Sequence, residues 1–82
     1  MKFMAVFRLK PDADRKTVAE LVPKERTRTR ELHDEGLLEE IYVGVDDTAY
    51  IVFEVADRGA LDAALRSFPL HDYADWEVKE LR

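Results

Sequence analysis

The chain has 82 residues, a net charge of −5 and no cysteine. This length predicts one domain, residues 1–82, and the missing cysteine excludes disulfides, thiolate metal sites and cysteine nucleophiles. The acidic balance offers no basic surface for nucleic acid, and no apolar run approaches the ~20 residues of a membrane span. With no signal-peptide pattern at its start, the chain is expected to be cytoplasmic.

The first predicted element is a β-strand over residues 2–9. Its side chains alternate between two faces, and neither face is polar. Both faces must therefore be covered by something else in the fold or by a partner. One face carries Phe3, Ala5, Phe7 and Leu9, and the other carries Met4 and Val6.

A long helix is predicted over residues 14–35. Asp12 or Asp14 provides its N-terminal cap, and Gly36 ends it. Pro23 interrupts this segment, because proline lacks the backbone N–H and its ring clashes with the preceding turn. Either the helix is kinked near Pro23, or a short helix ends there and a second begins.

One stripe of this helix is expected to face the sheet. At about 3.6 residues per turn, six residues share that side. Two of them, Glu25 and Thr29, are polar, and a carboxylate in an apolar stripe requires an explanation. The full stripe is Val18, Leu21, Val22, Glu25, Thr29 and Leu32.

The rest of the chain predicts three strands and one further helix. Asp46 and Asp47 form a tight turn between the first two of these strands, Asp57 caps the helix and Pro69 prevents it from continuing. The elements are strand 37–45, strand 48–56, helix 58–68 and strand 73–81.

The order β-α-β-β-α-β predicts the fold class α+β. With right-handed crossovers it gives a ferredoxin-like βαββαβ sandwich, an antiparallel four-stranded sheet with strands one and three central and both helices on one face. The other face then exposes an apolar surface of a size that is rare in a monomer. A second copy packed sheet to sheet would cover it, so we expect a homodimer or a higher homo-oligomer, a dimeric α+β barrel.

Several sequence runs are similar to a known family. The resemblance covers nearly the whole length, and the chain resembles the muconolactone isomerase-like branch of the dimeric α+β barrels. The runs that carry it are Phe53-Glu54-Val55, Arg66-Ser67-Phe68-Pro69-Leu70, His71-Asp72-Tyr73-Ala74-Asp75-Trp76-Glu77-Val78, Lys24-Glu25-Arg26 and Glu35-Gly36.

The resemblance implies a cofactor-independent isomerase of aromatic compound catabolism. Such an enzyme shifts a double bond in a small unsaturated lactone or related metabolite, and a recessed carboxylate suits that proton transfer. Glu25 matches an acidic residue of the family and is the expected acid/base. His71 is a second catalytic candidate, and Arg28 and Tyr73 are candidates for substrate binding.

Each candidate has a structural alternative. Glu25 could reach water past Pro23 or pair with Arg28 or Arg8, and His71 could be a residue of a surface loop. Tyrosines often pack in interfaces. No metal site is expected, since two histidines without a third ligand do not define one.

A non-catalytic protein of the same fold is the competing functional hypothesis. It would be a small-ligand-binding or structural oligomer. Met4 and Val6 support it, because they stand where the family has a histidine and a basic residue. A cleft filled by Met4, Val6 and Leu21 would favour this hypothesis over the enzyme.

Overall fold

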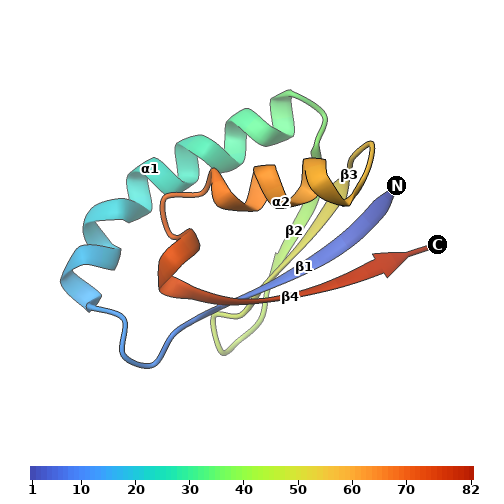
Figure 1. Cartoon of the computed structure of the whole chain (residues 1–82). Helices are drawn as coiled ribbons and strands as arrows, with labels where there is room; N and C mark the ends of the chain where they lie inside the picture. Colours follow the sequence, from blue (N-terminus) through green and yellow to red (C-terminus); the bar gives the residue numbers. More distant parts are fainter.

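The computed structural model describes all residues, 1–82. Two α-helices and a four-stranded sheet follow one another in the order β-α-β-β-α-β, with a short 3₁₀ turn before the last strand (Figure 1). The elements are β1 (Lys2–Leu9), α1 (Arg15–Asp34), β2 (Leu38–Val43), β3 (Ala49–Glu54), α2 (Arg58–Arg66), η1 (His71–Tyr73) and β4 (Ala74–Leu81).

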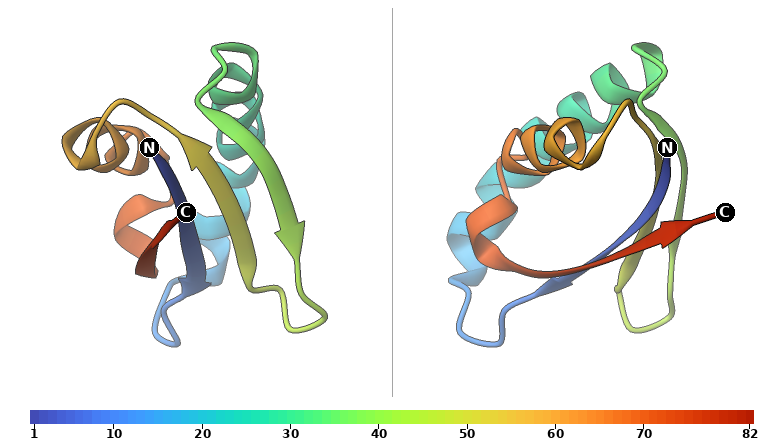
Figure 2. Two further views of the ribbon diagram at one scale, coloured as in Figure 1. Left: turned by 90° about the vertical axis from the view of Figure 1, so that its right-hand side faces the viewer. Right: turned by 45° about the vertical axis from the view of Figure 1, so that its right-hand side comes forward.

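The sheet has the strand order β2-β3-β1-β4, and every neighbouring pair is antiparallel. Both helices lie on the same side of it, which we call the inner face (Figures 1 and 2). The predicted fold class is therefore confirmed, including the central position of the first and third strands. The two central strands are the ones that the sequence makes apolar on both faces.

The core lies between the helices and the inner face. Phe3 and Phe53 are opposite each other in the β1–β3 register, and each is at most 2% exposed. Leu32 of α1 and Leu61 of α2 reach the same cluster and are fully buried. Because side chains alternate along each strand, Met4 and Val6 lie on the opposite, outer face.

Both helices begin with an aspartate cap. Asp14 accepts a hydrogen bond from the backbone N–H of Lys16, and Asp57 accepts one from that of Ala60 at 2.8 Å. Such caps satisfy backbone donors that have no partner inside the helix. Pro23 lies inside α1, which continues through it as one helix. Of the two predicted alternatives the break is wrong, and the kink stays a prediction.

The remaining differences from the predicted elements lie at their ends. The β2–β3 hairpin turns over a wider loop than an Asp46-Asp47 pair, since the N–H of Gly44 donates to the carbonyl of Thr48. Asp47 has a positive φ of 67°, as is usual for the last residue of a three-residue hairpin loop. This wider loop shortens both flanking strands, and α2 ends at Arg66 with Ser67 as its C-cap. No helix has both the length and the apolar composition to cross a membrane.

Candidate active site

A cleft of about 350 Å³ opens between α1 and the inner face of the sheet. Strands β1, β2 and β3 supply an apolar wall, and α1 supplies the polar groups at its side. The buried residue Leu70, from the segment after α2, closes one end. The lining consists of Phe7, Glu25, Arg26, Thr29, Ile41, Val43, Ala49, Ile51 and Leu70.

Glu25 is the carboxylate of this cleft. Its Oε1 accepts a hydrogen bond of 3.0 Å from the backbone N–H of Leu70, a residue 45 positions away in the chain. Its Oε2 makes no hydrogen bond or ion pair within the chain. Neither Arg8 nor Arg28 forms an ion pair with Glu25. Arg8 forms one with Glu77, and Arg28 forms one with Glu31. Glu25 is therefore oriented by one oxygen and free to react through the other.

Burial raises the pKa of Glu25 above its ordinary value, and the hydrogen bond from Leu70 opposes that rise. A half-buried carboxylate loses part of the hydration that stabilises its charged form, so the protonated form is favoured. A carboxylate with a raised pKa is the better base once it is ionised, and it can return the proton afterwards. The other residues of the stripe are partly buried, apart from the fully buried Leu32, and the hydroxyl of Thr29 donates a hydrogen bond of 2.9 Å to the backbone carbonyl of Glu25.

The raised pKa predicts a dependence of stability on pH. Between the unfolded pKa of Glu25 and its higher folded pKa, the folded state binds more protons, so the free energy of unfolding decreases as pH rises. Glu25→Gln keeps the acceptor for Leu70 and removes the charge. We expect this variant to be more stable than the wild type at neutral pH and equal to it below about pH 4, the ordinary range of a glutamate. Denaturant unfolding at a series of pH values measures the difference, and a difference of opposite sign would contradict the prediction.

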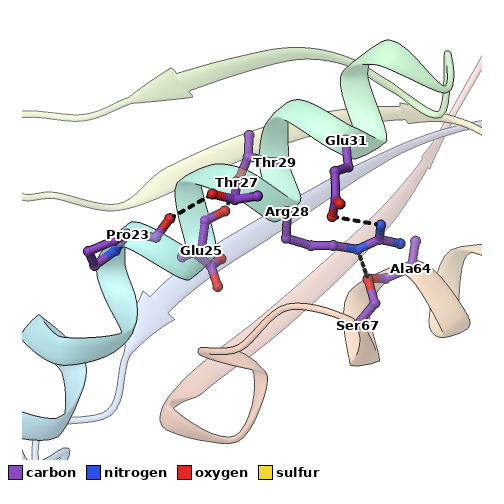
Figure 3. A network of polar contacts seen from close by, with 8 residues as sticks. All are labelled: Pro23, Glu25, Thr27, Arg28, Thr29, Glu31, Ala64 and Ser67. Carbon is purple, nitrogen blue, oxygen red and sulfur yellow. Dashed lines mark hydrogen bonds and ion pairs between the residues drawn. The ribbon is translucent and has the colours of Figure 1, made fainter.

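Arg28 does not line the cleft. Its Nε donates to the Oγ of Ser67 at 2.8 Å, and its Nη1 lies 3.3 Å from the Oε1 of Glu31. Figure 3 shows the side chain extending from α1 toward the end of α2. These contacts connect the two helices, and they direct the Arg28 side chain away from the cleft of Glu25.

His71 also lies elsewhere, in a hollow of about 330 Å³ between α2 and β4. Its Nδ1 is 2.9 Å from the Oδ1 of Asp72, and its ring stacks on Trp76 with centroids 6.1 Å apart. Trp76 in turn contacts the rings of Phe7 and Phe68. The structure thus brings His71 into an aromatic cluster and not to the carboxylate of Glu25.

Tyr73 belongs to the 3₁₀ turn η1, and its backbone carbonyl accepts from the N–H of Lys10 at 2.9 Å. It does not line the cleft either. The polar residues that do accompany Glu25 are Arg26 and Thr29. Sequence reasoning named Thr29 only as part of the stripe and gave Arg26 no role, although its position next to Glu25 was a usable signal.

The residues that would have filled the cleft in a non-catalytic protein are absent from its lining. Met4 and Val6 pair with Val52 and Tyr50 and project from the outer face, and Leu21 is not among the lining residues. The cleft thus remains open beside Glu25. No group of three or more histidine, aspartate or glutamate side chains is arranged to hold a metal ion.

Comparisons with known proteins decide the family. The sequence model described as muconolactone delta-isomerase matches residues 1–82. The chain belongs to the muconolactone delta-isomerase family. Among solved structures, the chain is similar to a crystal structure of muconolactone isomerase, with a TM-score of 0.84 and 28% sequence identity. That likeness covers 99% of this chain and 88% of the other.

The family assignment and the fold agree with the resemblance found in the sequence runs. No curated protein sequence matches the chain. The protein is thus muconolactone isomerase-like in sequence family and in structure.

Proposed function

We propose that the protein is a cofactor-independent isomerase that moves a proton, and with it a double bond, within a small unsaturated lactone or related metabolite. The observation that carries this proposal is the carboxylate of Glu25, held by one oxygen in an apolar cleft. The isomerase named by the family model and by the similar crystal structure supports the same chemistry.

The proposed reaction uses Glu25 twice. Its free Oε2 removes the acidic C–H proton at the γ-carbon of the unsaturated lactone, and the electron pair of that bond is delocalised through the C=C bond onto the carbonyl oxygen as a dienolate. The protonated carboxyl then returns a proton to another carbon of the conjugated system, which restores the ionised base. The apolar side chains of Phe7 and Ile51 line the cleft beside Glu25, and an apolar surface next to the reacting groups strengthens nearby electrostatic interactions.

The direct test is incubation of the protein with muconolactone and related lactones in deuterated buffer. We expect isomerisation, as followed by proton NMR, and the fraction of solvent deuterium at the carbon that receives the proton measures how far the carboxyl of Glu25 exchanges with solvent before it returns the proton. No isomerisation of any such lactone would remove the proposed activity while leaving the family and the fold in place.

We further propose that the protein works as a homodimer. The centre of the outer face is formed by Met4, Val6, Tyr50 and Val52, which the register places side by side on the two central strands. Charged residues of the edge strands, such as Glu77, surround this apolar centre. Val6 is already buried, but Met4, Tyr50 and Val52 are only partly buried, and a second copy of the chain packed on this face would cover them and complete an α+β barrel.

This assembly gives a prediction for solution. At protein concentrations of roughly 1–100 µM, we expect a stable dimer or larger oligomer. Its interface should bury about 1,200–2,000 Å² or more. Light scattering after size-exclusion chromatography measures the mass. Val52→Lys should shift the protein toward monomer because it places a charge in the interface, whereas Ala56→Lys, in the exposed loop after β3, should not. A folded wild-type monomer throughout the range would contradict the assembly.

A further inference from the structure

The cleft of Glu25 continues past the polar residues of α1 into a second hollow. This hollow, of about 530 Å³, lies between α1 and the edge strand β2, and we call it the α1–β2 groove. Arg26, Thr29 and Ile41 line both spaces, so the groove continues directly from the cleft. The groove is lined by Arg26, Thr29, Arg30, His33, Leu38, Glu39, Glu40 and Ile41.

The two glutamates of the groove are already engaged. The carboxylate of Glu39 lies 3.2 Å from the Nζ of Lys2, and that of Glu40 accepts a hydrogen bond from the hydroxyl of Tyr42. A β-bulge between Leu38 and Glu40 places Glu39 as the extra residue of β2. The charge of Glu39 is therefore compensated by Lys2 outside the groove, and the carboxylate of Glu40 is directed to the hydroxyl of Tyr42.

The two arginines of the groove lie on one side of α1, together with His33. Arg26, Arg30 and His33 are spaced by four and three residues, the spacing that puts side chains on neighbouring turns of the same face. Neither Arg26 nor Arg30 makes any hydrogen bond or ion pair in the structure. By contrast, Arg28 of the same helix is bonded to Ser67 and Glu31.

Arg26 and Arg30 are exposed, and they differ from Arg15, another unpaired arginine of α1, in that they line the groove that continues from the cleft of Glu25. The guanidinium group has a planar set of donors that matches a carboxylate with two parallel hydrogen bonds. At about 1.5 Å rise per residue, Arg30 lies roughly 7 Å, and His33 roughly 12 Å, along α1 from Glu25. An anionic group bound there would be well separated from the reacting carbons.

We infer that the α1–β2 groove binds the carboxylate of an elongated acid whose unsaturated part lies in the cleft beside Glu25. The inference rests on the proposed isomerase function and specifies its substrate class. The substrate is an acid with a chain between its reactive portion and its carboxylate, and it is longer than a compact lactone acid. Arg26 and Arg30 bind its carboxylate, and Leu38 and Ile41 contact its apolar chain.

The test uses unreactive probes, so it does not depend on turnover. Butyrate, hexanoate and octanoate, and the alcohols of the same lengths, are titrated into the isotopically labelled protein and followed by backbone amide NMR. We expect binding to tighten with length for the acids more than for the alcohols, with shifts at Leu38 and Ile41. Arg30→Gln should weaken octanoate binding about tenfold, the scale of one charged hydrogen bond, and leave octanol binding unchanged.

Arg15→Gln is the matched control, since Arg15 lies on the first turn of the same helix and outside the groove. Equal effects of Arg15→Gln and Arg30→Gln, or equal binding of acids and alcohols, would overturn the inference. Selective octanoate binding without any lactone isomerisation would keep the groove and remove the proposed activity. Isomerisation of a lactone acid together with equal binding of octanoate and octanol would keep the activity and overturn the groove.

Discussion

Replacing Phe53 with alanine is expected to lower the free energy of unfolding by about 3–5 kcal/mol, the usual cost of removing a buried phenylalanine ring. Phe53 is completely buried at the centre of the sheet, between Phe3 of β1 and Leu38 of β2 in the register. Domains of this kind have roughly 5–15 kcal/mol of total stability. The midpoint of thermal unfolding should therefore fall by roughly 12–40 °C, at about 4–8 °C for each kcal/mol.

Denaturant and thermal unfolding followed by circular dichroism measure this loss, at one fixed protein concentration because assembly contributes to stability. Val45→Ala is the control, because Val45 projects fully into solvent at the β2–β3 turn. Its effect should stay within about 0.5 kcal/mol. A loss below about 1 kcal/mol for Phe53→Ala would mean that the core does not depend on tight packing around this ring.

The fold was predictable because local patterns determine it. Alternating apolar residues identify β1 and β3, and their lack of a polar face indicates that they are central. Asp57, Pro69 and Gly36 mark helix ends through backbone chemistry that does not depend on the rest of the fold. The ends that were misplaced, such as those of β2 and β3, depend on the conformation of the hairpin loop. That loop needs a positive φ at Asp47, which the sequence did not make obvious.

The candidate site was predictable only in part. The helical period placed Glu25 on the inner side of α1, since that depends on α1 alone. Its bond to the N–H of Leu70 depends on a contact between residues 45 positions apart, which no local pattern encodes. The same holds for Arg28, whose long side chain could have turned to the cleft or to Ser67. His71 and Tyr73 lie on a short 3₁₀ turn, and the direction of the His71 ring follows from its stacking on Trp76 of β4, which no local pattern encodes.

Glu25→Gln is expected to reduce turnover by about a hundredfold or more on any substrate that the wild type isomerises. This is the usual scale for removing a general base. Gln has the same volume and can accept the hydrogen bond from Leu70, but its amide cannot take up a proton from carbon. The effect should therefore fall on kcat and leave KM nearly unchanged. Initial rates measured over a range of substrate concentrations separate kcat from KM. Deuterium uptake is measured in parallel.

Glu20→Gln is the matched control, because Glu20 is an exposed carboxylate on the same helix and does not line the cleft. Its turnover should equal that of the wild type, and full activity in Glu25→Gln would remove Glu25 from the mechanism. The stability of the two variants makes the interpretation unambiguous. Because the raised pKa of Glu25 reflects a cost of burying its charge, Glu25→Gln should unfold at a higher denaturant concentration than the wild type at neutral pH. A variant that is more stable and yet inactive would indicate that this carboxylate is retained for its chemistry at a cost in stability, as is common for residues of active sites.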